Sequence, residues 1–120
     1  MATVFNNIDR VAGDPLNAVN VAIELIWDTS VSSIARILNE DTVVRGLYST
    51  TTDADGYWEV DLVSNDDIIP ADSLYKITER LAISNDTAVY YISVPNSATP
   101  ISWIGDIVLD PGDVPNWASA

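Results

Sequence analysis

The sequence predicts an all-β protein, an antiparallel β-sandwich of seven strands. Apolar and polar residues alternate along several stretches, as expected where one strand face is buried and the other meets water. Turn-forming Gly, Pro, Asn and Asp separate these stretches at intervals of roughly 8–15 residues, and helical periodicity is almost absent. The strands are expected at residues 3–11, 19–27, 42–51, 58–62, 74–81, 88–94 and 101–109.

The first two expected strands differ in clarity. Residues 3–11 have only scattered apolar positions, which suit an irregular strand, and a Gly-Asp-Pro-Leu turn follows at residues 13–16. Residues 19–27 then alternate strictly. Their apolar face consists of Val19, Val21, Ile23, Leu25 and Trp27. Residues 28–41 match a helical turn about as well as a ragged strand, so we expect a long connection with local structure.

A β-hairpin is expected at residues 48–63. A Thr-rich extended run meets an Asp-Ala-Asp-Gly turn, and strict alternation follows. We interpret Asp53, Asp55 and Gly56 as the fold-defining turn that sets the strand register. The buried face of the second arm is expected to be Trp58, Val60 and Leu62.

The later segments complete the expected core. Ile68 and Ile69, inside a polar turn, are expected to plug one end of it. The strand at 74–81 should bury Tyr75, Ile77 and Leu81. Residues 88–94 are apolar on both faces until Ser93, which favours a central strand. The tryptophans expected on buried strand faces are Trp27, Trp58 and Trp103.

A length of 120 residues suits one domain with its own core. We expect an N-terminal arm at residues 1–7, the sandwich at 8–110 and an extended C-terminal tail at 111–120. Both termini are expected to be flexible, because they lack the alternation that strands require. The candidate partner-contact residues are Val4, Phe5 and Trp117.

The net charge of −13, from 18 acidic and 5 basic side chains, argues against nucleic acid and anionic membranes as partners. No apolar run approaches the roughly 20 residues of a membrane span, and no general secretion signal opens the chain. Histidine and cysteine are absent, which excludes Ser-His and Cys-His catalysis, disulfides and zinc-thiolate sites. We expect no catalytic residue, no cofactor and no metal ligand.

The acidic residues allow two minor alternatives. Asp53, Asp55, Asp66 and Asp67 lie in turns, where a calcium site outside the EF-hand pattern is conceivable. A hydrolase using Asp66 or Asp67 is a further hypothesis, but a glycosidase needs one carboxyl in apolar surroundings. The favoured interpretation is that these residues form turns and wet strand faces.

Several motifs together resemble the prealbumin-like β-sandwich domains, which are related to carboxypeptidase regulatory-like domains and occur in tailed-phage virion proteins. The resemblance covers about residues 8–110. Its first feature is the expected strand that follows the turn at residues 13–16. Its motifs are Thr51-Thr-Asp-Ala-Asp-Gly-Tyr-Trp58, Leu62-Val-Ser-Asn-Asp-Asp67, Tyr75-Lys-Ile-Thr-Glu-Arg80, Tyr90-Tyr-Ile-Ser-Val-Pro95 and Trp103-Ile-Gly-Asp106.

The resemblance implies a non-enzymatic structural protein of a phage virion, assembled in the host cytoplasm. Such domains occur on head fibres, tail fibres and capsid-surface appendages. The implied partners are other virion proteins, such as capsid or tail subunits. We also expect a homo-oligomer, because the ends of the chain lack strand alternation and can reach a neighbouring subunit. The alternative is an adhesin module whose Trp117, loop aromatics and loop acids bind a host glycan or receptor.

Overall fold

The computed structural model describes residues 2–9, 12–80, 87–96 and 101–118. These residues form ten strands in three sheets, together with four short helical segments, so the prediction of an all-β protein is confirmed. The described strands number ten and not seven, because the expected segment at residues 42–51 is divided into two strands and two expected connections contain short strands, Ala35–Ile37 and Ile68–Ile69.

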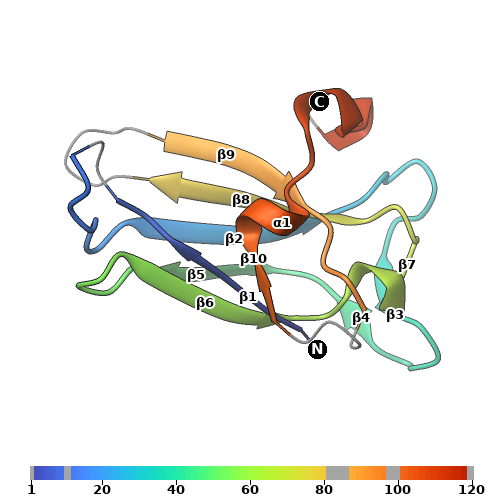
Figure 1. The fold of residues 1–120 in the computed structure, drawn as a ribbon. Coiled ribbons are helices and arrows are strands. Elements are labelled where there is room, and N and C mark those ends of the chain that lie inside the picture. The colour runs from blue at the N-terminus through green and yellow to red at the C-terminus, as the bar shows by residue number, and fades with distance from the viewer. Residues whose placement is uncertain (1, 10–11, 81–86, 97–100, 119–120) are drawn as a thin grey trace.

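Figure 1 shows the three sheets and the short helical segments. The three-stranded sheet has the order β10 (Ile101–Trp103), β1 (Ala2–Asn7), β6 (Tyr57–Leu62). The four-stranded sheet has the order β5 (Leu47–Thr51), β2 (Asn20–Ile26), β8 (Leu74–Arg80), β9 (Thr87–Ile92). The end sheet has the order β4 (Val43–Val44), β3 (Ala35–Ile37), β7 (Ile68–Ile69). The helical segments are α1 (Ile104–Ile107), η1 (Asn65–Asp67), η2 (Pro111–Asp113) and η3 (Asn116–Ala118).

Period-2 alternation predicts the buried faces of β2 and β6 correctly. Val19, just before β2, and Val21, Ile23 and Leu25 on it are buried, whereas Asn20 and Glu24 are exposed. Trp27, the last residue of the predicted face, follows the strand and is only half-buried. On β6, Trp58, Val60 and Leu62 are buried and the two acidic residues between them face water. Each fully buried large apolar side chain contributes about 1.5–3 kcal/mol relative to an exposed one.

One hydrophobic core joins the three sheets. Val4 and Trp58 contribute from the three-stranded sheet, Ile23 and Ile77 from the four-stranded sheet, and Ile68 from the end sheet. Ile68 is buried as expected for a plug at one end of the core, whereas Ile69 is only half-buried. The expected inward position of Leu81 lies outside the described residues.

The expected hairpin at residues 48–63 is wrong as a pair of neighbouring strands. β5 pairs with β2 in the four-stranded sheet, whereas β6 pairs with β1 in the three-stranded sheet. The turn between them therefore carries the chain from one sheet to the other. Alternation identifies which face of a strand is buried, but it does not identify the strand beside it.

The expected N-terminal arm is also wrong for residues 2–7, which form β1. This strand pairs in antiparallel fashion with β6 along its whole length and in parallel with β10. Its alternation is short, but Ala2 and Val4 are buried between the sheets. The burial of these two side chains, together with the two strand partners, holds the strand in place.

Three expectations for the last third of the chain need correction. β9 is an edge strand and not a central one, although its end is covered by the segment that contains Val108, which bridges to Ile92. The expected last strand stops at Trp103, because helix α1 follows directly. The tail after residue 110 is not extended throughout, since η2 and η3 form two helical turns there.

Candidate interaction surfaces

The predicted turn residues form a tight connection at the end of the molecule that we call the turn end. Oδ1 of Asp53 accepts hydrogen bonds from the amides of Asp55 (2.8 Å) and Tyr57 (3.1 Å). Gly56 has a φ of +74°, and its carbonyl accepts a hydrogen bond from the amide of Ile8 (2.8 Å). The turn is therefore joined to the segment that follows β1.

The predicted partner-contact residues lie in three different environments. Val4 has 0% of its side chain exposed, so it belongs to the core and cannot contact a partner in this fold. Phe5 points to the opposite face of β1, where its ring stacks on Tyr57 with centroids 5.9 Å apart. Trp117, in η3, is half-buried against the protein and does not project as a free aromatic ring.

The turn acids do not gather into one site. Asp53 and Asp55 precede β6, whereas Asp66 and Asp67 follow it in η1, and a six-residue strand spans about 20 Å. Figure 1 places the two turns at opposite ends of the molecule. Among the described residues, no group of three or more carboxylates lies close enough to hold a metal ion. The structure therefore separates the four acids of the calcium hypothesis.

A buried polar cluster near the turn end escaped the sequence analysis. Glu79 is only 9% exposed, and its Oε2 accepts hydrogen bonds from Nε1 of Trp58 (2.7 Å) and Nδ2 of Asn6 (3.1 Å). Nε1 of Trp103 donates to Oδ1 of the same asparagine (3.1 Å). The sequence signal was available, since Glu79 continues the period-2 face of Ile77 into the core.

Tyr90 also lies in this cluster. Its hydroxyl is buried near Glu79 and Asn6 without a hydrogen bond of good geometry. Burial, and then the charge of Glu79, raise the pKa of this hydroxyl above its usual value. The cluster links β1 and β6 of one sheet to β8 and β9 of the other, so it is a connection between sheets and not an exposed site.

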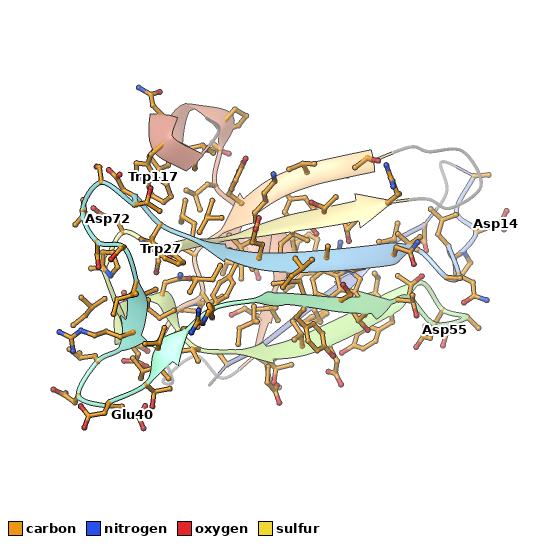
Figure 2. All side chains as sticks on the ribbon, turned by 180° about the vertical axis from the view of Figure 1, so that it is seen from behind. Asp14, Trp27, Glu40, Asp55, Asp72 and Trp117 are labelled. Carbon is orange, nitrogen blue, oxygen red and sulfur yellow. The ribbon has the colours of Figure 1, made fainter. Side chains whose placement is uncertain are left out.

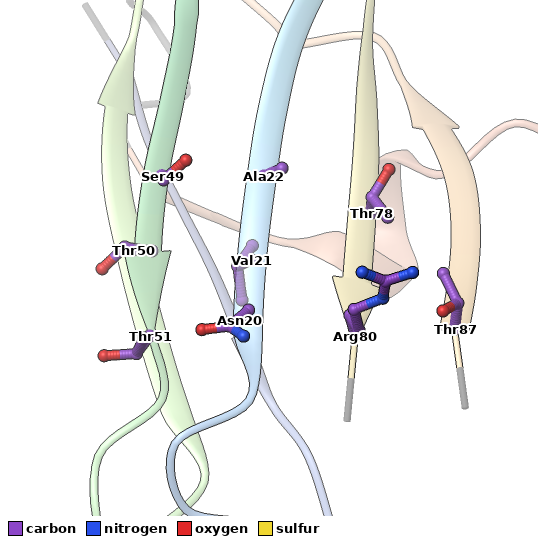
Figure 3. Close-up of a pocket in the computed structure, with 9 residues that line it drawn as sticks. All are labelled: Asn20, Val21, Ala22, Ser49, Thr50, Thr51, Thr78, Arg80 and Thr87. Atoms are coloured by element: carbon purple, nitrogen blue, oxygen red, sulfur yellow. The ribbon is translucent and has the colours of Figure 1, made fainter. Parts of the chain in front are cut away.

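A shallow hollow of about 530 Å³ lies on the outer face of the four-stranded sheet near the turn end. The residues around it are Asn20, Val21, Ala22, Ser49, Thr50, Thr51, Thr78, Arg80 and Thr87. Figure 3 shows Asn20 on β2 next to Arg80 on β8, with the guanidinium group lying between β8 and β9. These lining residues include hydroxyls, an amide and one cation, and none of them is acidic.

Strand register explains the composition of this hollow. Asn20 is paired with both Thr51 and Arg80, so three polar side chains form one row across the sheet. In the next row, Ala22 lies between Ser49 and Thr78. The small side chain of Ala22 leaves the surface lower between its two hydroxyl-bearing neighbours.

A second hollow, of about 380 Å³, lies beside Trp117. Its other lining residues include Asp72, Asp113 and Leu109. Figure 2 shows Trp117 and Asp72 at the same corner of the molecule. The structure therefore places the predicted aromatic residue beside Asp72, which lies 45 positions before it in the sequence, as well as beside the nearby Asp113.

Exposed apolar side chains concentrate in the segment of residues 31–48, which we call the apolar end. Six of the ten large exposed hydrophobic residues in the described part of the chain belong to it. They are Val31, Ile34, Leu38, Val43, Leu47 and Tyr48. The segment contains two arginines and two acidic residues, so its formal charge is zero in a chain of net charge −13. It comprises β3, β4, the loops around them and the first two residues of β5 (Figure 1).

Comparison of the chain with models of known protein families and with curated proteins finds no match. In the part of the chain that the structure describes, no helix is both long and apolar enough to cross a membrane.

Proposed function

We propose that the protein is a non-enzymatic structural component of a phage virion, of the capsid-decoration or fibre and collar type. We further propose that its fold is a prealbumin-like β-sandwich, and that it is built into the particle in the host cytoplasm as a homo-oligomer. The motifs at residues 51–58, 62–67 and 75–80 support the fold assignment through their resemblance to phage domains.

The concentration of exposed apolar residues at the apolar end is the observation that carries the proposal. Single exposed hydrophobic side chains are normal on monomers, but a concentration of them marks an interaction surface. The zero formal charge of this segment matters as well. A neighbouring subunit that approaches here meets less repulsion than on the acidic remainder of the chain.

Mass spectrometry of purified virions tests the proposal directly, and absence of the protein from particles would end it. Incorporation of surface variants then tests the contact. Ile34→Asp and Leu47→Asp should reduce the copies per particle without reducing stability, because both side chains are exposed. Val89→Asp is the matched control, since Val89 is an exposed valine on the distant strand β9. Equal incorporation of all three variants would remove the apolar end from the proposal.

A second candidate function, glycan or receptor binding by an adhesin module, is favoured by the hollow beside Trp117. An aromatic ring next to carboxylates is a common arrangement for sugars, because the ring packs on C–H faces while the carboxylates accept hydroxyl hydrogen bonds. A glycan array with the wild-type protein and Trp117→Ala tests this function. Binding that survives the substitution would exclude this hollow.

A further inference from the structure

We propose that the hollow on the outer face of the four-stranded sheet binds the carboxylate-bearing end of an acidic saccharide. The inference does not rest on the virion proposal, and it concerns different residues from the hollow beside Trp117. The volume of the hollow on the four-stranded sheet, about 530 Å³, lies within the range of roughly 300–1,000 Å³ that small-molecule sites occupy.

Arg80 supplies the charge for the carboxylate. Its guanidinium is the only formal charge among the residues around the hollow, and none of the described side chains forms an ion pair with it. A guanidinium group can donate two parallel hydrogen bonds to a carboxylate, which gives both affinity and orientation. In a chain with 18 acidic residues, a hollow without a lining carboxylate is where an anion meets the least local repulsion.

The polar groups around Arg80 match the rest of a saccharide. Asn20 lies directly opposite Arg80 across the two strands, and the cross-strand side chains of such a pair lie about 5 Å apart at Cβ. The amide of Asn20 and the hydroxyls of Ser49 and Thr78 can both donate to and accept from sugar hydroxyls. The methyl group of Ala22 offers a small apolar floor for a C–H face of the ring.

Long-range charge does not cancel this local attraction. At physiological ionic strength the Debye length is about 8 Å, so distant acidic residues are largely screened. Lys76 lies on the same face of β8 as Arg80, four residues before it, and Glu24 is paired with Lys76 across the sheet. Among the described residues of this face, the charges of Lys76 and Glu24 therefore balance each other, and the charge of Arg80 remains in excess.

The test is an NMR titration of the full ¹⁵N-labelled chain with N-acetylneuraminic acid and with glucuronic acid. N-acetylglucosamine and acetate serve as probes that lack, respectively, the carboxylate and the ring hydroxyls. We expect saturable shifts of amides in residues 20–22, 49–51 and 78–80 with both acidic sugars, and binding at least about tenfold weaker with either control probe. Sialyllactose added in a further titration distinguishes a free sugar acid from a glycan terminus as the preferred ligand.

Two variants and a matched control decide the site. Arg80→Gln should weaken acidic-sugar binding by about tenfold, the loss expected for a hydrogen-bonded ion pair. Arg36→Gln, which removes an exposed arginine from β3 in the end sheet, should leave binding unchanged. Ala22→Leu should abolish binding, because the larger side chain would occupy the hollow. If that variant fails to fold, Arg80→Gln still tests the site, because Arg80 is exposed. No saturable shifts, shifts confined to residues near Trp117, or equal binding by Arg80→Gln and wild type would each overturn the proposal.

Discussion

Replacing Gly56 by alanine should destabilise the protein by about 3–4 kcal/mol, which is much more than a glycine-to-alanine change normally costs. Gly56 lies in the turn that connects the two large sheets, with a φ of +74°. A Cβ at this position would collide with the carbonyl oxygen of Ile8 and press on the amide of Leu16. Those two backbone groups are themselves hydrogen-bonded to each other at 2.8 Å.

The magnitude has two parts. An L-residue in the left-handed region costs about 1–2 kcal/mol. Relieving the collision requires the backbone at Ile8 to move. This movement disturbs two hydrogen bonds, one that the Ile8 amide donates to the carbonyl of Gly56 and one that the Ile8 carbonyl accepts from the amide of Leu16. Each backbone hydrogen bond is worth about 1 kcal/mol net, so this part adds about 2 kcal/mol.

Gly46→Ala is the matched control for this prediction. Gly46 also has a positive φ, of +107°, but a Cβ there would meet nothing within 4 Å. It should therefore show only the conformational cost of about 1–2 kcal/mol. Urea unfolding monitored by the fluorescence of the buried Trp58 measures both free energies of unfolding. If Gly56→Ala loses no more stability than Gly46→Ala, the contact between the turn and Ile8 does not contribute as argued.

Three further predictions concern buried polar groups. Trp58→Phe should cost about 1.5–3 kcal/mol beyond its lost packing, because Glu79 loses a hydrogen-bond donor; a smaller loss in urea unfolding would count against the cluster. Thr52→Val should cost about 1–3 kcal/mol by calorimetry, since the hydroxyl bridges two backbone groups, whereas Thr51→Val on the exposed edge should change stability by less than about 0.5 kcal/mol. Burial raises the pKa of the Tyr75 hydroxyl above 10.0. The contribution of this neutral hydroxyl to the free energy of unfolding is therefore complete below about pH 10 and is lost as the pH rises further, at about 1.4 kcal/mol per pH unit. Urea unfolding at about pH 9–11 should therefore show a shallower decline for Tyr75→Phe, and an equal slope would contradict the role of this hydroxyl.

Strand faces could be predicted from the sequence where one face is buried and the other is wet. β2 and β6 meet that condition, and their alternation predicts each buried position. Strand partners could not be predicted, because pairing depends on residues far away in the chain. The turn at Asp53 looks like a hairpin turn in sequence, but the strands on either side of it find partners in different sheets.

The same limit applies to the candidate surfaces. Arg80 and Asn20 lie about sixty positions apart in sequence, and only the antiparallel register of β2 and β8 places them in one row. Trp103 illustrates a different failure. It is expected in the core, yet it is 47% exposed, because β10 points Ser102 toward the core and leaves Ile101 and Trp103 on its outer face. A strand of three residues followed by a short helix is too short for its sequence to show which face is buried.

The two ends of the protein have different physical roles, and this difference can be measured. At the turn end, the hydrogen bonds that Asp53 and Gly56 accept fix the turn, and those that Glu79 accepts join the two large sheets, so changes there should alter the free energy of unfolding. At the apolar end, exposed side chains such as Leu47 contribute little to the isolated fold but would be buried by a neighbour. A partner that binds only the folded chain adds stability by mass action. Turn-end variants should therefore be rescued in part by assembly, whereas substitutions of exposed apolar-end side chains, such as Leu47→Asp, should fold normally alone and gain nothing from it.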